Sequence, residues 1–292
     1  MKKYFYCLLI PVLITACSTN KNKQAGPLRL TTITIHGDTI PQYTFRYDSD
    51  GHLVELVKHN QENDTNTTTF TYDSSNRITG MVATHQDNRR QQIQQRATVK
   101  TWDKHGNVEE VQYYDGTDKP VRTAKISWQK GLPVAMKYSD STQAISWDYT
   151  DGNPNWKNLC TDSVTGGNKD TSIFVRSANY EWDTSTNPLR PLVNQLLLGP
   201  GISPVPVAGP FADITYMLLH ISANNPTLIK VAEKEKSVYK QYAQEYQRQT
   251  TIQFFYAYNR NGYPENARVH LHTEGYTKLG TDTQLTLDYL YQ

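Results

Sequence analysis

The feature that most constrains this chain is a short sequence unit that recurs along almost its whole length. In the first full copy, Phe45 and Tyr47 lie two residues apart, and residues 48–51 then supply Asp and Gly before a second apolar run begins. Side chains two apart in a strand share a face, so the unit predicts a β-hairpin with an apolar–aromatic pair on its packed face. The pair recurs as Phe70/Tyr72, Ile126/Trp128, Ile145/Trp147, Tyr180/Trp182, Tyr256/Tyr258 and Leu287/Tyr289.

Repeated hairpins predict an all-β fold, an antiparallel meander that forms a curved or twisted sheet. The composition agrees, because hydrophobic residues make up only 37% of the chain, as expected for sheets with one face in water. The 20 Tyr residues favour the same fold, since a tyrosine can pack its ring while its hydroxyl stays in water. The sequence leaves open whether such a sheet curls into a barrel-like shape.

The amino terminus carries the most specific motif. Two lysines precede an apolar run at residues 4–14, and Ile14-Thr15-Ala16-Cys17 follows, an arrangement that resembles a bacterial lipobox. The resemblance implies that residues 1–16 are a signal peptide and that Cys17 carries the lipid. An ordinary signal peptide or a short membrane helix is the alternative, but the run is shorter than the ~20 residues that a spanning helix needs.

The rest of the chain is expected to form a short tether, residues 17–27, followed by one repeat-built β domain, residues 28–292. Removal of residues 1–16 leaves 28 basic residues against 28 acidic ones, so no electrostatic footprint for nucleic acid remains. Cys160 is then the only cysteine besides Cys17, which excludes an intrachain disulfide and favours a small buried side chain. Nothing in the sequence calls for a cofactor.

The repeat is interrupted after Trp182. Residues 188–210 are rich in Pro and Gly yet carry several leucines, which predicts an apolar loop packed against the sheet and excludes a central strand. Phe211–Ile221 is expected to be the one short helix, with Pro210 at its start. Residues 235–248 fit a helix or a strand, and periodicity does not decide between them.

The Tyr/Trp-Asp-x-x-Gly/Asn unit is similar to the YD repeats of Rhs-type proteins. Together with the lipobox and the segments Trp182–Pro188, Asn224–Pro226 and Tyr258–Pro264, it more closely resembles a group of uncharacterised lipoproteins of Bacteroidota. The resemblance implies successive β-hairpins and an outer-membrane lipid anchor, and it carries over no catalytic residue. Surface-displayed members often have acidic residues after the cysteine, whereas Lys21 and Lys23 lie there in this chain and favour the periplasmic side, with surface display as the alternative.

Two groups of residues suggest chemistry but have simpler explanations. His270, His272 and Glu274 alternate along a predicted strand and could share a face as metal ligands, yet no second ligand pair accompanies them, so surface packing is favoured and no metal is expected. The repeat aspartates Asp48, Asp73, Asp103, Asp148 and Asp183 could serve glycoside hydrolysis, but their place before each turn favours bonds to backbone amides.

The expected function is non-catalytic, a binding or scaffolding module that has the membrane as one partner through its lipid and a protein or glycan as another. The alternative is a glycan-binding accessory lipoprotein of polysaccharide uptake, for which exposed aromatic side chains would be the mark. Trp156 lies outside the repeat phase and is the first candidate for ligand stacking, while the repeat tryptophans are expected in the core. A hydrolase comes third, because it would need a cleft with two carboxylates at catalytic separation.

Overall fold

The computed structural model describes residues 28–61, 63–140, 143–154, 158–165, 171–199, 221–239, 242–275 and 280–292. The expected signal peptide and tether, with Cys17, lie outside these residues, as do Trp156 and all of the expected helix Phe211–Ile221 except Ile221. The prediction of an all-β meander is confirmed within them. The strands are β1 Leu30–Ile35, β2 Tyr43–Tyr47, β3 Leu53–Gln61, β4 Asp64–Tyr72, β5 Ile78–Gln86, β6 Gln91–Trp102, β7 Val108–Asp115, β8 Pro120–Gln129, β9 Leu132–Tyr138, β10 Gln143–Ser146, β11 Tyr149–Thr150, β12 Asn153–Pro154, β13 Asn158–Thr165, β14 Thr171–Thr186, β15 Asn224–Tyr239, β16 Tyr242–Tyr258, β17 Pro264–Glu274 and β18 Thr281–Tyr291.

The main strands close into one antiparallel barrel, in which each strand pairs with the strands before and after it in the chain. Strand β1 completes the ring because it pairs with β2 on one side and with β18 on the other. Strands β11 and β12 form a separate two-stranded sheet, so β10 pairs directly with β13. A closed ring removes most free sheet edges, which a meander of this length would otherwise expose.

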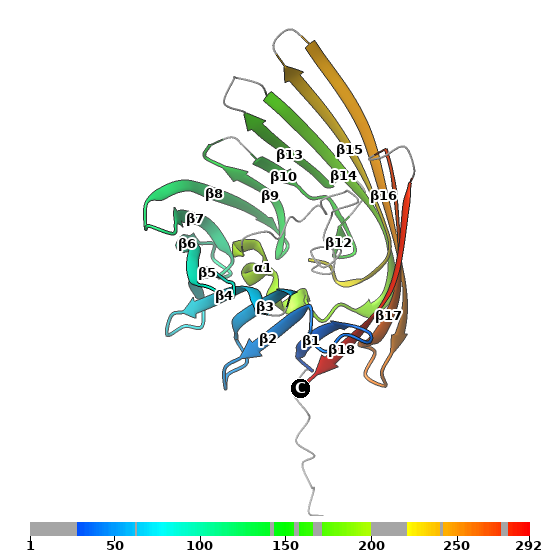
Figure 1. Cartoon of the computed structure of the whole chain (residues 1–292). Helices are drawn as coiled ribbons and strands as arrows, with labels where there is room; N and C mark the ends of the chain where they lie inside the picture. The colour runs from blue at the N-terminus through cyan, green and yellow to red at the C-terminus, as the bar shows by residue number, and fades with distance from the viewer. Residues whose placement is uncertain are drawn as a thin grey trace, which may run out of the picture.

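The two ends of the barrel differ, and we name them from Figure 1. At the lower end lie the tight turns after β2, β4 and β6, and the two ends of the described chain meet there, since Arg29 and Gln292 exchange backbone hydrogen bonds of 3.1 and 3.0 Å. At the upper end, β14, β15 and β16 rise beyond most of the other strands and flare outward (Figure 1).

Residues 235–239 and 242–248 are strand, which decides for them the question that the sequence left open. They form the upper parts of β15 and β16, which pair without a register shift from Leu228↔Gln253 to Tyr239↔Tyr242. Their side chains therefore alternate between the inner and outer walls of the barrel.

The alternation sets apolar residues inside and polar residues outside. In β6, Ala97 and Val99 are buried while Thr98 and Lys100 are exposed, and β8 repeats the pattern. The part of the barrel interior that these side chains line is thus an apolar core.

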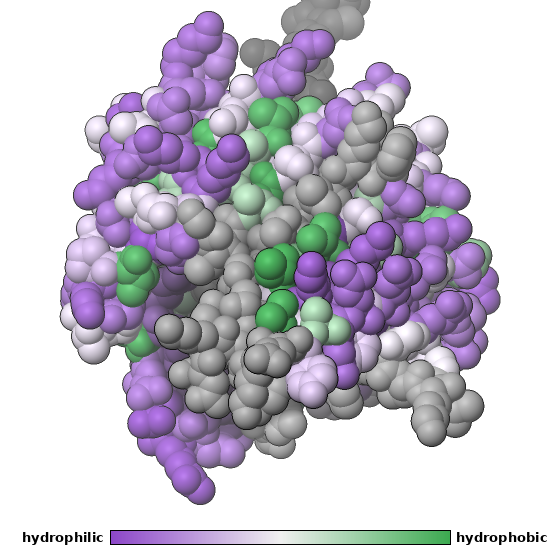
Figure 2. Space-filling view, turned by 90° about the horizontal axis from the view of Figure 1, so that it is seen from above, coloured by the Kyte–Doolittle hydropathy of each residue, from purple (hydrophilic) through white to green (hydrophobic). Residues whose placement is uncertain are grey.

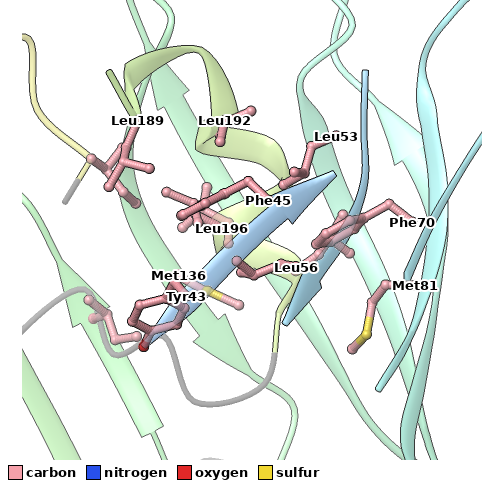
Figure 3. Packing of buried hydrophobic residues seen from close by; sticks show 14 of the residues in the cluster. Tyr43, Phe45, Leu53, Leu56, Phe70, Met81, Met136, Leu189, Leu192 and Leu196 are labelled. Carbon is pink, nitrogen blue, oxygen red and sulfur yellow. The ribbon is translucent and has the colours of Figure 1, made fainter. Parts of the chain in front are cut away.

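The helix in the described residues is α1, Val193–Leu198, preceded by the 3₁₀ turn η1, Arg190–Leu192. It lies in the Pro-rich segment that the sequence predicts as a packed loop. The packing is confirmed, because Leu196 and Leu198 are fully buried, but the conformation is helical at 193–198. The helix sits inside the barrel, where Leu189, Leu192 and Leu196 pack against the inward side chains of β2 and β3 (Figures 1 and 3). The run of leucines is helical because one short helix can bury all of them within the ring.

Candidate functional site

The aromatic side chains of the repeat close the lower end of the barrel. Five aromatic side chains at the ends of strands each donate a hydrogen bond, from a tyrosine hydroxyl or an indole N–H, to the backbone carbonyl of the residue that begins an earlier strand. The donors and acceptors are Tyr47 and Leu30 (3.1 Å), Tyr72 and Leu53 (2.7 Å), Trp102 and Ile78 (2.9 Å), Trp128 and Val108 (2.7 Å), and Tyr291 and Pro264 (2.8 Å). The rings pack on the core while their polar atoms hold neighbouring hairpins together, so they serve structure.

The turn aspartates are structural as well. Asp73 Oδ1 accepts hydrogen bonds from the backbone amides of Ser75 and Arg77, each at 2.9 Å, and Asn76 has a positive φ of 62°, which Asn tolerates better than most residues. Asp48 and Asp103 accept the same pattern of bonds. Bonds from the Arg77 amide and other nearby donors lower the pKa of Asp73, so its carboxylate is ionised at neutral pH.

Asp183 differs from the other aspartates of the repeat in its hydrogen-bond partners and its burial. It accepts bonds from the backbone amides of Ser185 (2.9 Å) and Asn225 (3.1 Å), and the Tyr258 hydroxyl donates to its Oδ2. Burial raises the pKa of Asp183 above its usual value. This cluster joins the three segments Trp182–Pro188, Asn224–Pro226 and Tyr258–Pro264, which explains why they share a polar signature. Its bonds run from one backbone segment to another, as in a structural joint.

Helix α1 completes the closure of the lower end. Gln195 donates to the Tyr72 hydroxyl at 3.0 Å, and the Asn194 side chain accepts from the amide of Val108 at 3.2 Å. With the leucines of α1 filling the space between them, this part of the interior is a packed core.

The upper inner wall has a different character. Strand register aligns nine inward side chains of β14, β15 and β16 in three rows, which we call the inner-wall network. The rows are Ser172, Ser237 and Gln244; Phe174, Glu235 and Tyr246; and Arg176, Glu233 and Arg248. One step below them the inner face is closed to solvent, with Ala178, Val231 and Thr250 fully buried in one row. The network therefore lies where the core ends and the mouth of the barrel begins.

The charged members of this network bind one another closely. Arg176 Nε lies 2.6 Å from Glu233 Oε2, and Arg248 Nη1 lies 3.1 Å from Glu233 Oε1 and 2.6 Å from Glu235 Oε2. The Glu233 side chain is only 4% exposed, and a buried charge without a partner is costly. The guanidinium groups of Arg176 and Arg248 both compensate it. Ser237 extends the network, donating to Glu235 at 2.6 Å.

These contacts favour the charged forms of Glu235 and Arg248. The bond from Ser237 and the adjacent Arg248 lower the pKa of Glu235, although partial burial opposes this effect. Burial also works against the charge of Arg248, but its bonds to Glu235 and Glu233 prevail and raise its pKa. Two positive and two negative charges thus face the mouth with no net charge.

The aromatic members of the network lie against its arginines. The Arg176 guanidinium lies over Phe174 at 5.7 Å, and that of Arg248 lies over Tyr246 at 5.3 Å. Tyr246 is 43% exposed and Tyr242, which alternation places on the same face, is 74% exposed. Seen from the upper end, the rim of the barrel is largely hydrophilic, with hydrophobic patches nearer the middle (Figure 2). The inner-wall network therefore offers fixed hydrogen-bonding groups beside solvent-exposed rings.

The histidines that the sequence singles out lie on the outer wall. His272 contacts Asp282 at 2.7 Å and Glu274 at 3.1 Å, and the bonds from Asp282 and Glu274 raise the pKa of His272. No group of three possible metal ligands occurs among the described residues. His270 and His272 do share a face as predicted, and it is a face of surface ion pairs.

The remaining predicted site residues divide between the core and the parts not described. Trp147 is buried, while Trp102 and Trp128 pack on the core as predicted. Cys17 and Trp156 lie outside the described residues, so lipidation at Cys17 and stacking on Trp156 stay predictions. The inner-wall network is missing from the sequence-based candidates. One signal could have revealed it, the alternation of Glu233 and Glu235 with Lys234 and Lys236, which has the period of a strand.

Comparison with solved structures gives weak likenesses to porin-like proteins. No family model matches the chain, and no curated protein matches it. A porin-like protein from Bacteroides uniformis ATCC 8492 is 16% identical with a TM-score of 0.46, covering 91% of this chain and 96% of that one. A porin-like protein from Bacteroides vulgatus ATCC 8482 is 9% identical with a TM-score of 0.36, covering 91% and 99%. Within the described residues, no helix has the length and hydrophobicity to cross a membrane.

Proposed function

We propose that this protein is a non-catalytic, lipid-anchored binding module of the bacterial cell envelope that takes its ligand at the upper mouth of the barrel. The observation that carries the proposal is the polarity of the wall, with exposed Lys and Thr outward and an apolar core inward. Such a wall is suited to water, so attachment to the bilayer falls to the lipid on Cys17.

The position of the chain ends supports the orientation. Arg29 and Gln292 pair at the lower end, so the tether of residues 17–27 joins the barrel at that closed end. The flared inner wall then points away from the membrane, toward molecules in solution. The outer membrane is the expected site, and Lys21 and Lys23 favour its periplasmic side.

The electrostatics of the inner-wall network support binding over hydrolysis. A glycosidase needs one carboxylic acid that stays protonated near neutral pH, and environments that raise a carboxyl pKa provide it. Here the pKa of Glu235 is lowered, and both Glu233 and Glu235 accept bonds from arginine. Glycan uptake is favoured as the setting by the exposed rings of Tyr242 and Tyr246.

Metabolic labelling with palmitate tests the anchor. We expect the wild-type protein to be labelled and to sediment with membranes, and the Cys17→Ala variant to lose both properties. Cys160→Ala is the matched control, because it removes the other mature cysteine and should keep the label. Label retained in Cys17→Ala would refute lipidation at Cys17.

Protease cleavage of the tether on isolated membranes tests whether the barrel itself enters the bilayer. We expect protease removal of the tether to release the folded barrel into the soluble fraction, because its outward face is polar. A barrel that stays with the membrane after cleavage would contradict the proposal.

A further inference from the structure

Two tyrosines on the inner wall stand in water. Inward side chains lower in the barrel are buried, whereas Tyr242 and Tyr246 are 74% and 43% exposed. They lie four residues apart on one face of β16, a spacing of about 13 Å along a strand. An aromatic face beside polar groups is a surface on which a sugar ring can stack through its apolar face. The spacing lets one ligand longer than a single sugar ring contact both tyrosines.

The groups beneath these rings are fixed in place. Tyr246 donates to the Gln244 side chain at 2.6 Å, and Ser172 and Ser237 lie 2.7 Å apart. The ion pairs of Arg176, Glu233, Arg248 and Glu235 hold further donors and acceptors at set positions. A ligand rich in hydroxyl groups can bond to such a surface without first ordering it.

The charge balance selects among polar ligands. Because each carboxylate of the network is already bonded to arginine, an anionic or cationic ligand would have to compete with an existing ion pair. An uncharged ligand need break none of these pairs. The network thus favours hydroxyl-rich ligands without net charge.

We infer that the inner-wall network and Tyr242 form a binding site for an uncharged oligosaccharide. This inference rests on the proposed role as a binding module and names the class of ligand. The other ligand that the geometry admits is an extended peptide, because the described pairing of β16 with β17 begins only at Gln249, which leaves residues 242–248 with β15 as their pairing partner. The sugar is favoured because the exposed rings and the fixed polar groups lie on the face of the wall and not along that edge.

The test is a binding titration on the full-length lipidated protein, purified in a detergent without a sugar headgroup. Cellohexaose, xylohexaose, mannohexaose and maltohexaose serve as neutral probes, with an oligogalacturonate as the anionic probe, and calorimetry reports the affinity. We expect at least one neutral hexaose to bind. Replacement of Tyr246 by Ala should weaken that binding about tenfold, which corresponds to ~1.4 kcal/mol.

The matched control is Phe255→Ala. Phe255 is 53% exposed on the same strand, but alternation places it on the outer wall, so its removal should leave the affinity unchanged. Tyr246→Phe keeps the ring and loses only the bond to Gln244, and it should weaken binding less than Tyr246→Ala. The Tyr242→Ala/Tyr246→Ala pair should abolish measurable binding.

Several results would overturn the inference. They are binding of none of the four hexaoses, equal loss of affinity in Tyr246→Ala and Phe255→Ala, preference for the oligogalacturonate, or binding of unstructured peptides without binding of sugar. Failure of the proposed lipid-anchored role can be told apart from failure of the oligosaccharide site, because palmitate labelling of Cys17 reports on the anchor alone. Reducing ends that accumulate from a bound hexaose would contradict the non-catalytic role while leaving the sugar site in place.

Discussion

The lower and upper ends of the barrel are built from the same strands but differ in the side chains that line them. At the lower end several aromatic side chains make the same bond in successive hairpins, such as Trp102 to the carbonyl of Ile78 and Trp128 to that of Val108. At the upper end β14, β15 and β16 outgrow this repeat and carry charge on their inner face. The regular end closes the structure, and the irregular end offers groups that the fold alone does not require.

The difference shows where function can be sought in a repeat-built protein. Side chains that recur in register, including the turn aspartates, are accounted for by the hairpins they hold together. Inward charges also occur at Lys58 and at Arg122, which lies over the rings of Tyr113 and Tyr138. The inner-wall network differs in joining four charged side chains through ion pairs. Burying such pairs contributes little net stability compared with apolar residues of similar size. The presence of the network is better explained by a ligand than by stability.

The largest expected effect sharpens the contrast from the lower end. Leu196→Ala should lower the free energy of unfolding by about 2–5 kcal/mol, because it opens a cavity in the packed interior around α1. Urea denaturation followed by tryptophan fluorescence measures the change. Tyr242→Ala at the upper end is the comparison and should stay within about 0.5 kcal/mol of the wild type. Equal effects at the two ends would break the comparison.

A second variant tests whether the upper end holds together through its ion pairs. Glu233→Ala leaves Arg176 and Arg248 without their shared carboxylate and should destabilise the flared strands by up to about 3 kcal/mol. Native-state hydrogen exchange should show faster exchange in β14–β16 and unchanged exchange near α1. Glu245→Ala, on the outer wall of β16, is the control and should have little effect. Global loss of protection in Glu233→Ala would show that the two ends do not behave separately.

A third variant tests the aromatic bonds of the lower end. Trp102→Phe keeps a ring on the core but removes the indole donor to Ile78, and it should cost about 1 kcal/mol from the lost hydrogen bond, with a further contribution from the smaller ring. Trp128→Phe removes the equivalent bond to Val108 and should cost a similar amount in the same urea measurement. A large difference between them would mean that the bonds are not equivalent from hairpin to hairpin.

The smallest expected effect concerns pH and separates Asp183 from the other repeat aspartates. The lowered pKa of Asp73 means that its stabilising contribution is present above the unfolded value of about 3.9 and is lost as the pH falls through the lower folded value. The raised pKa of Asp183 has the opposite sign, so its contribution is present in acid and is lost as the pH rises through the raised value.

The measurement is the free energy of unfolding as a function of pH. Asp73→Asn should reduce the loss of stability in acid below about pH 3.9, and Asp183→Asn should remove a decline that occurs above it. Parallel curves for the two variants would contradict the difference in environment between the two carboxylates.

Much of the lower end is predictable from the sequence, and most of the upper end is not. Turns such as 48–51 and 73–76 depend on residues within a few positions of one another, so a local pattern is enough to place them and to predict the positive φ of Asn76. The Pro-rich segment is predictable as packed, but its helix at Val193–Leu198 forms because the barrel interior buries its leucines together. The inner-wall network depends on residues 235–248, whose conformation the local pattern leaves undecided.

The sequence by itself determined the hairpins, their turn residues and the inward direction of their aromatic rings, because these follow from interactions between near neighbours in the chain. Only the tertiary structure decided that β1 meets β18 to close a ring, that α1 lies within it, and that Arg176, Glu233 and Arg248 share one row. Those features bring together residues from distant parts of the chain. Their alignment is set by strand register across the whole sheet, which no short stretch of sequence specifies.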